Sequence, residues 1–402
     1  MELFLQILTV FLAVFTGYFA LSALYFFVFS AGYHFYREKD THKPESKKLN
    51  IAVLLPSYKE DAVILESACE ALKHQSQLAN LQTWVIADKL QPQTITALKA
   101  MDANVVKVKF KKSTKSKSLN EAMKQLPANT DHVIVLDADN VMQPGFVDEI
   151  IARLQKGFRV VQGHRTSKNN NTSMAVLDSI SEEVNNSIFR MGHRVFGLSA
   201  SLIGSGFICE YALFKQLMEI ATAVGGFDKE MEVNLLEKNI RIGYARRAVV
   251  LDEKVQQSEV FVNQRRRWLS AQLVYFRKNI AKSLQSLVLK GNVDFFDKII
   301  QFVLPPRMIA LGMSVIFFGA FALLWLLQVT EFQIFTIAWT AILLVNILAI
   351  LLSIPATMYN KKMGKALLSL PSGFLYMALA LFKTRGANRS FIHTTHGVKD
   401  SK

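Results

Sequence analysis

The chain has 402 residues, a formal net charge of +15 and 51% hydrophobic residues. Basic soluble proteins are seldom so apolar, whereas a membrane protein with a basic cytoplasmic face fits this composition. The two cysteines, Cys69 and Cys209, are too few for a disulfide framework or a thiolate metal site. The composition therefore favours a membrane protein with its cysteines in a reducing compartment.

Residues 1–36 are predicted to hold a transmembrane helix. Residues 3–30 contain no charged side chain, and a bilayer core needs about 20 apolar residues of helix. The run is too long and too uniformly apolar for a cleaved signal peptide. The segment that follows, "REKDTHKPESKK", is rich in lysine and arginine, which places it in the cytoplasm. Residues 37–290 are then expected to form a cytoplasmic domain.

Alternating strand and helix patterns in this region predict an α/β domain with a mostly parallel sheet. In such sheets ligands bind beyond the carboxyl ends of the strands. Aspartates follow directly on two of the predicted strands, so we expect them at a binding site. The strands are predicted over 51–55, up to Asp88, over 103–110, and up to Asp137 and Asp139, with helices from about Asp61 and over 116–126.

The "DAD" at 137–139 carries two carboxylates on one side of an extended chain, because residues two apart share a face. Two nearby carboxylates repel, so such a pair is usually held by a cation. Few, hard oxygen ligands suit Mg²⁺ or Mn²⁺ rather than zinc. The alternative for an isolated Asp-x-Asp is a solvated turn in which Asp139 caps the next helix.

Residues 291–307 are predicted to form an amphipathic helix in the membrane interface. Five apolar residues recur there at helical spacing, and two prolines end the run. Residues 308–402 are predicted to hold a transmembrane region and a basic tail, with spans over 308–330 and 332–359. The stretch 366–382 contains Pro371 and Gly373, and it is either a further span or a re-entrant segment. The five apolar residues are Phe295, Phe296, Ile299, Ile300 and Val303.

Five motifs occur in a fixed order: "KSKSLN" at 115–120, "DAD" at 137–139, "GSG" at 204–206, "KEMEV" at 229–233 and "QRRRW" at 264–268. With this series the chain resembles the family 2 glycosyltransferases, in the membrane-integral processive branch of cellulose, hyaluronan, chitin and poly-N-acetylglucosamine synthases. Gln264, Arg267 and Trp268, in the Q-x-x-R-W spacing ahead of apolar spans, carry most of the resemblance. It implies a GT-A fold, with a Rossmann-like catalytic domain between transmembrane helices.

The resemblance implies a membrane-bound inverting enzyme that transfers a sugar from a nucleotide-diphosphate sugar, with a UDP-sugar as the expected donor, to a growing β-linked polysaccharide. A non-processive enzyme that adds one sugar to a lipid, as ceramide glucosyltransferases do, is the first alternative. The charge suggests a second, an inactive scaffold or binder of anionic ligands. The basic run 107–117 contains one aromatic residue, Phe110, and no alternation of basic and aromatic side chains, so no nucleic-acid partner is expected. Membrane lipids are expected partners, and the expected location is a bacterial inner or plasma membrane.

The resemblance also assigns roles to residues. Asp137 and Asp139 are expected to bind the diphosphate through Mg²⁺ or Mn²⁺, with Asp139 as the direct ligand. Of the remaining arginines in "QRRRW", one of Arg265 and Arg266 is expected at the donor and the other at lipid headgroups. Gly204, Ser205, Gly206 and Trp268 are expected to form the acceptor wall. The nucleotide sugar is expected to bind Tyr58, Glu60, Asp88, Lys117, Asn120, Asp137, Gln264, Arg267 and Trp268.

The catalytic base is where the sequence departs from these relatives. They usually carry Thr-Glu-Asp, and the aspartate takes the proton of the acceptor. Here the chain reads Glu230, Met231 and Glu232. Counting back from Gly243 puts Glu232 in the place of the aspartate, so Glu232 is the expected base and Glu230 the second choice. The alternative is that both glutamates are surface carboxylates at a helix start.

Overall fold

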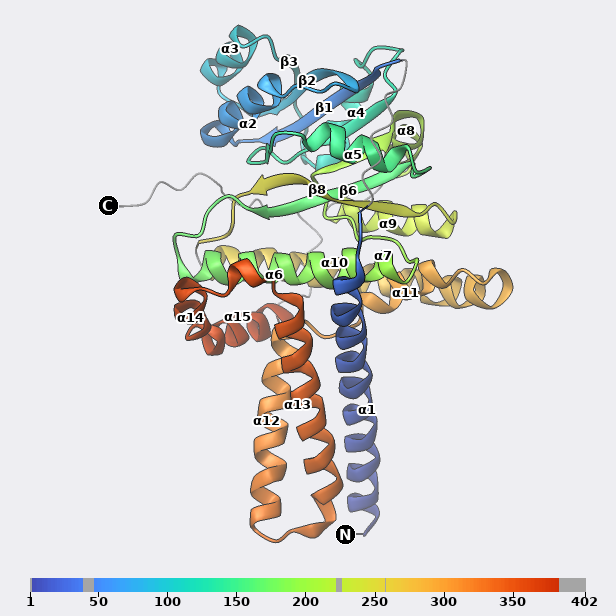
Figure 1. Ribbon diagram of the computed structural model, residues 1–402, viewed down its shortest axis with the longest axis vertical. Helices are drawn as coiled ribbons and strands as arrows, with labels where there is room; N and C mark the ends of the chain where they lie inside the picture. The colour runs from blue at the N-terminus through green and yellow to red at the C-terminus, as the bar shows by residue number, and fades with distance from the viewer. Residues whose placement is uncertain (1, 39–46, 222–225, 257, 383–402) are drawn as a thin grey trace.

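The structure is a computed structural model that describes residues 2–38, 47–221, 226–256 and 258–382. An α/β domain lies at one end, three long helices extend away from the other, and a layer of helices separates the two (Figure 1). The basic tail predicted after the last apolar stretch lies outside the described residues, as does most of the basic segment after the first.

A mixed sheet forms the centre of the α/β domain; in the described residues it has eight strands in the order β3-β2-β1-β4-β7-β6-β8-β5. The strands β3, β2, β1 and β4 run parallel, as do β6 and β8, whereas β7 is antiparallel to both of its neighbours and β5 to β8. The predicted parallel order therefore holds for the first half of the sheet, and β7 makes the second half mixed. The strands are β1 (Leu49–Tyr58), β2 (Ala79–Asp88), β3 (Asn104–Val108), β4 (His132–Val135), β5 (Val141–Met142), β6 (Val160–Ser167), β7 (Phe207–Glu210) and β8 (Ile242–Asp252).

Helices cover both faces of the sheet, which explains why its central strands are continuous apolar runs. Alternate residues of β1 enter opposite cores: Val53 and Leu55 belong to one cluster, and Ala52 and Leu54 to the other. The first core includes residues of α2 (Asp61–Lys73), α3 (Pro92–Ala100) and α5 (Phe146–Leu154). The second includes residues of α4 (Lys115–Met123), α8 (Tyr211–Glu219) and α9 (Phe227–Glu237).

The middle layer lies between the sheet and the long helices (Figure 1). It contains α6 (Ser173–Asn185), which continues as a π-helical turn over Asn186–Gly192 and as α7 (His193–Val195), together with α10 (Ser258–Lys290) and α11 (Val293–Gln301). Gly192 allows α1 (Glu2–Gly32) to approach closely, since a Cβ there would lie 2.2 Å from the carbonyl oxygen of Phe29. This contact fixes the middle layer against the first long helix.

The amphipathic helix predicted over 291–307 is present as α11. On its apolar side Phe295 and Ile299 are fully buried in the same core as Leu235 and Leu236 of α9, whereas Phe296, Ile300 and Val303 are only partly buried. Part of the apolar side therefore packs on the α/β domain. The periodicity correctly predicted a helix with one apolar side, but it could not show which partner covers that side.

Among the described residues, three helices are long and apolar enough to cross a membrane: α1 (Glu2–Gly32), α12 (Arg307–Leu326) and α13 (Gln333–Ser353). The shorter α14 (Lys361–Leu367) and α15 (Leu370–Phe382) meet at a bend of 55° and count as a fourth span only if taken together. The helix is therefore interrupted near Pro371. The bend lies between α14 and α15, and Pro371 is the second residue of α15, a position in the first turn that tolerates proline. Short 3₁₀ turns occupy Tyr33–Phe35, Thr330–Phe332 and Ala356–Met358.

Candidate active site

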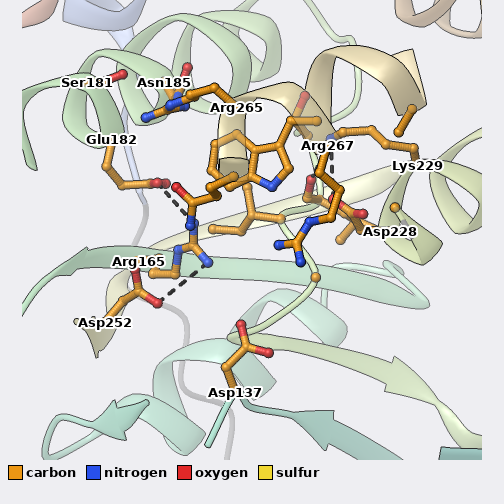
Figure 2. Close-up of a pocket in the computed structure, with 18 of the residues that line it drawn as sticks. Asp137, Arg165, Ser181, Glu182, Asn185, Asp228, Lys229, Asp252, Arg265 and Arg267 are labelled. Atoms are coloured by element: carbon orange, nitrogen blue, oxygen red, sulfur yellow. Dashed lines mark hydrogen bonds and ion pairs between the residues drawn. The ribbon is translucent and has the colours of Figure 1, made fainter. Parts of the chain in front are cut away.

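A cavity of about 460 Å³ lies between the carboxyl ends of the first strands and the middle layer. Its lining comes from both halves of the protein: β1, β2 and the residues after β4 on the sheet side, and α1, α6, α10, α12 and α15 on the other. Figure 2 shows charged side chains pointing into it from several of these elements. The cavity therefore joins the predicted donor site to the region of the long apolar helices.

The end of the cavity at β1 and β2 is lined by buried polar atoms, several of which have no hydrogen-bond partner among the described residues. Asp88 is 1% exposed, and neither of its carboxylate oxygens has a hydrogen-bond partner among the described residues. The hydroxyl groups of Ser57 and Ser113, which also line the cavity, lack partners in the same part of the chain. Tyr58 and Glu60 complete this end. Buried polar atoms are almost always hydrogen-bonded, so these side chains fit a polar ligand that would supply the missing donors and acceptors.

The two aspartates of the "DAD" motif both line the cavity, but they differ in surroundings. Strand β4 ends at Val135, so the motif lies in the following turn rather than in extended chain. Asp137 is 37% exposed and forms an ion pair with Lys115. Asp139 is 2% exposed, and its carboxylate accepts hydrogen bonds from the backbone N–H of Glu253 (2.9 Å) and the amide of Asn140 (3.3 Å). Asp137 is therefore the more accessible of the two.

Lys115, rather than the predicted Lys117, faces the cavity. Its ammonium group donates to the carbonyl oxygen of Gly204 at 2.8 Å as well as to Asp137. Lys117 is exposed and donates to the carbonyl oxygen of Lys112 (3.2 Å), and Asn120 donates to that of Met218 (2.9 Å). Neither lines the cavity. Residues two apart on a helix do not share a face, so only one of the two lysines can point to the ligand.

Only Gly204 of the "GSG" motif lines the cavity, so the structure does not bring the whole predicted acceptor wall together. The φ of Gly204 is +80°, a value that side chains disfavour. Gly206 has a packing role, because a Cβ there would lie 2.5 Å from the side chain of Val250. Ser205 is fully buried and accepts a long hydrogen bond from Arg165 (3.4 Å).

The predicted base Glu232 does not line the cavity. It is fully buried, with its carboxylate 3.0 Å from Lys298 and 3.4 Å from Lys229, and it accepts a hydrogen bond from the backbone N–H of Leu202 (2.7 Å). Burial alone would raise the pKa of Glu232, but the two lysines outweigh it and hold the pKa below the ordinary value. Glu230 is also buried and away from the cavity.

The carboxylate of α9 that lines the cavity is Asp228, in the first turn of the helix. Its side chain is 20% exposed and lies 3.4 Å from the ammonium group of Lys229. Residues four apart share a face of a helix, so Asp228 and Glu232 lie on the same side, the first at the cavity and the second behind it. Glu232, the predicted base, therefore lies one helical turn away from the carboxylate that lines the cavity.

The "QRRRW" segment lies in α10, and Gln264, Arg265, Arg267 and Trp268 all line the cavity, whereas Arg266 does not. Figure 2 shows the guanidinium of Arg267 in the space near Asp137 and Asp228. Burial lowers the pKa of Arg267, against the opposing effect of these two carboxylates. Arg265 donates to Asp178 at 2.5 Å and lies over the indole of Trp268, with 4.5 Å between guanidinium carbon and ring centroid.

A buried charged network was missed by the sequence reasoning. Arg165 of β6 bonds Glu182 of α6 at 3.0 Å, and Arg190 bonds the other oxygen of the same glutamate at 3.1 Å. Lys254 bonds Asp252 at 2.8 Å beside them. Charged residues inside otherwise apolar strand and helix patterns were the available signal. His164, the neighbour of Arg165, is structural and contacts Tyr244 (2.7 Å) and Glu183 (3.3 Å).

The carboxylates present fit a divalent cation that is completed by phosphate. In the described residues no group of three or more histidine, cysteine or acidic side chains forms a metal site by itself. Mg²⁺, however, is commonly held by one or two carboxylates together with substrate phosphates. Asp137 has oxygens exposed to the cavity, and Asp139 lines the same cavity, so both carboxylates suit this role.

The family described as Glycosyltransferase like family 2 matches residues 49–271, more than half of the chain. The protein belongs to this family and is a glycosyltransferase, which sets aside the alternative of an inactive scaffold. No curated protein sequence matches the chain.

Two of the solved structures that match the chain are described as sugar-transferring enzymes, and both have TM-scores under 0.5. One is a mannosyltransferase from Pyrobaculum calidifontis in complex with GDP-Man and Mn²⁺, with 13% identity and a TM-score of 0.49, covering 85% of this chain and 97% of that one. Another is glucosyl-3-phosphoglycerate synthase from Mycobacterium tuberculosis, in complex with Mn²⁺, UDP-Glc and phosphoglyceric acid. It has 16% identity and a TM-score of 0.38, covering 55% of this chain and 81% of that one.

Proposed function

We propose that this protein is a membrane-bound inverting glycosyltransferase that takes a sugar from a nucleotide-diphosphate sugar, a UDP-sugar in the first instance, and transfers it to an amphiphilic acceptor. One observation carries the proposal: a single cavity has unsatisfied polar atoms at the strand ends and apolar residues at the long helices. The nucleotide would bind at Tyr58, Glu60 and Asp88, and the acceptor would enter from the side of the apolar helices.

The diphosphate would lie among the charged groups between these two ends. Lys115 and Arg267 approach the same region of the cavity as Asp137. A guanidinium fork and an ammonium group suit phosphate oxygens and would stabilise the negative charge that develops on the leaving diphosphate. Mg²⁺ or Mn²⁺ bound by Asp137 and Asp139 would add charge neutralisation at the same oxygens.

Asp228 is the base that the geometry favours. In the proposed step an acceptor hydroxyl oxygen bonds to the anomeric carbon, the bond from that carbon to the diphosphate oxygen breaks, and the hydroxyl proton passes to the Asp228 carboxylate. Attack from the face opposite the diphosphate inverts the anomeric centre without a covalent intermediate. Asp228 is exposed to the cavity, whereas the carboxylate of Glu232 is enclosed by two lysines.

The part of the cavity near the long helices favours a lipid acceptor. We call it the apolar half and define it by Phe26 of α1, Met174 and Leu177 of α6, Met308 of α12 and Met377 of α15. A polysaccharide carries hydroxyl groups on every residue, and it would leave these unpaired against methionine and phenylalanine side chains. Burial of an acyl or isoprenoid chain there would favour binding, because apolar surface of the chain and of the cavity would leave water.

Elongation of a polysaccharide remains the second candidate, and Trp268 is the observation that favours it. An indole in the wall of a glycosyltransferase cavity can stack on a sugar ring. One face of this indole is covered by the guanidinium of Arg265, so only the other is available.

The test uses the purified full-length protein with a panel of UDP- and GDP-sugars. Nucleotide release is measured with and without a bacterial lipid extract, and products are separated by thin-layer chromatography and mass spectrometry. A single glycolipid whose formation needs both donor and extract supports the proposal. A ladder of polymer products supports the second candidate, and an absence of turnover with every donor contradicts both.

A further inference from the structure

Arg307, the first residue of α12, is a cation of the cavity wall whose described partners are all neutral. Its guanidinium donates to the side-chain oxygen of Asn185 (2.9 Å) and to the carbonyl and hydroxyl oxygens of Ser181 (3.2 and 3.4 Å). The guanidinium lies 5.8 Å from the ring centroid of Phe189. No ion pair to Arg307 exists within the described residues.

The carboxylates nearby are already used by other arginines. Glu182 bonds Arg165 and Arg190, one through each oxygen. Asp178 bonds Arg265. Figure 2 shows Ser181, Glu182 and Asn185 on α6, with Arg265 beside Asn185. In the part of the chain that the structure describes, the neighbouring arginines thus have ion-pair partners, whereas Arg307 has none.

A partly buried cation without a counterion is unfavourable unless an anion completes it. The apolar half of the cavity, as defined above, begins at the same place: Met308 follows Arg307 directly, and Phe26 and Leu177 line the cavity with it. A ligand that satisfies both surroundings has an anionic head and an apolar tail. The donor diphosphate has a different proposed site, because its proposed partners Lys115 and Arg267 lie on α4 and α10. Lys115 pairs with Asp137 in the turn after β4, and the charge of Asp137 also acts on Arg267.

We propose that Arg307, with Asn185 and Ser181, binds the phosphate group of an amphiphilic acceptor whose tail lies in the apolar half. Arginine presents several donors in a planar fork, and the amide of Asn185 and the hydroxyl of Ser181 add more. A phosphate monoester offers three terminal oxygens to these donors, whereas a carboxylate offers two. The proposal rests on the proposed function, since it names the class of acceptor for that same cavity.

The test measures binding separately from transfer. Farnesyl monophosphate, its neutral counterpart farnesol, and inorganic phosphate are each titrated into the full-length protein in micelles of a neutral detergent, and bound ligand is measured by native mass spectrometry. We expect farnesyl monophosphate to bind at least tenfold more tightly than farnesol or inorganic phosphate, as one or two charge-assisted hydrogen bonds would give.

Two variants of the site and one control identify the residue responsible. Arg307→Gln is expected to weaken farnesyl monophosphate about tenfold to a hundredfold and to leave farnesol unchanged. Asn185→Asp keeps the arginine and the side-chain size but places a carboxylate beside the guanidinium, so it should weaken binding in the same direction. Lys362→Gln removes an exposed cation of α14 outside the cavity and should change nothing.

Each result decides the matter. The proposal is overturned if farnesol binds as tightly as farnesyl monophosphate, or if both site variants keep wild-type affinity. If inorganic phosphate binds as tightly as farnesyl monophosphate, the apolar tail is not recognised and an amphiphilic acceptor is ruled out. Loss of affinity in Lys362→Gln as large as in Arg307→Gln would reduce the effect to general membrane-surface charge and overturn it too. Donor turnover with failed farnesyl monophosphate binding refutes this inference alone, whereas intact binding with no turnover of any nucleotide sugar refutes the proposed function alone.

Discussion

Replacing Glu232 by glutamine separates a structural carboxylate from a catalytic one. The carboxylate is fully buried between Lys298 and Lys229, at 3.0 and 3.4 Å, and both lysines are largely enclosed. Removing one partner of a buried ion pair leaves an uncompensated charge and typically costs about 3–5 kcal/mol. Glutamine can still accept the hydrogen bond from the Leu202 N–H, so we expect the free energy of unfolding to fall by about 3 kcal/mol.

A control on the same helix makes the measurement specific. Glu237 pairs with Lys282 at the surface, where both side chains are substantially exposed. An exposed pair contributes about 0–1 kcal/mol, so Glu237→Gln should be close to neutral. Removing both charges in Glu232→Gln/Lys298→Met should recover part of the lost stability, because no unpaired charge then remains between these two positions.

The assay is thermal and denaturant unfolding of the purified protein, followed by donor turnover of the folded fraction. We expect Glu232→Gln to be less stable and to retain turnover when folded. The reasoning fails if Glu232→Gln unfolds like the wild type and yet loses transfer, since Glu232 would then act on the acceptor, as its position in the motif suggested.

Four further outcomes are expected. Asp228→Asn should lower transfer by about 10²–10⁴-fold, the usual contribution of a general base, with little change in unfolding midpoint. Lys115→Ala should lower donor turnover at least about tenfold while Lys117→Ala, two residues away and facing solvent, stays within about twofold; equal effects would contradict the placement of the donor. Chelation of divalent cations should abolish nucleotide release by the wild type, and Asp137→Asn should raise the Mn²⁺ concentration needed for half-maximal release. The pKa of Glu232 is held below its ordinary value of 4.5, so its ionised form stabilises the fold above that value and this contribution fades as pH falls through the folded pKa. The stability gap between wild type and Glu232→Gln should therefore shrink in acid, as unfolding at pH 7 and pH 4 would show.

Local patterns in the sequence were sufficient for most of the elements and for part of the site. Apolar runs without charge predicted α1, α12 and α13, and strands ending in aspartate predicted the edge of the sheet where Asp88 and Asp137 lie. The family resemblance assigned Gln264, Arg267 and Trp268 to the nucleotide-sugar site, and all three line the cavity. The elements were predictable because each depends on the periodicity of a single segment or on the end of a single strand.

Where the prediction and the structure differ, the deciding contact is with an element distant in sequence. Glu232 lies behind Asp228 because Lys298, on α11, closes over it. Phe295 and Ile299 of α11 share a core with α9, a contact that the periodicity of α11 alone does not reveal. Lys117 was predicted to bind the nucleotide sugar, whereas Lys115 lines the cavity. The motif indicates where a helix begins but not the direction in which each of its side chains points.

The sequence by itself thus determined the family, the α/β domain between apolar spans and the polar strand ends, since composition, periodicity and short motifs are local properties. Only the tertiary structure decided which carboxylate of α9 faces the cavity and that Arg307 meets Ser181 and Asn185, more than 120 positions earlier in the chain. Burial and ion pairing of a side chain depend on what packs against it, and those neighbours come from β6, α6, α10 and α11 together.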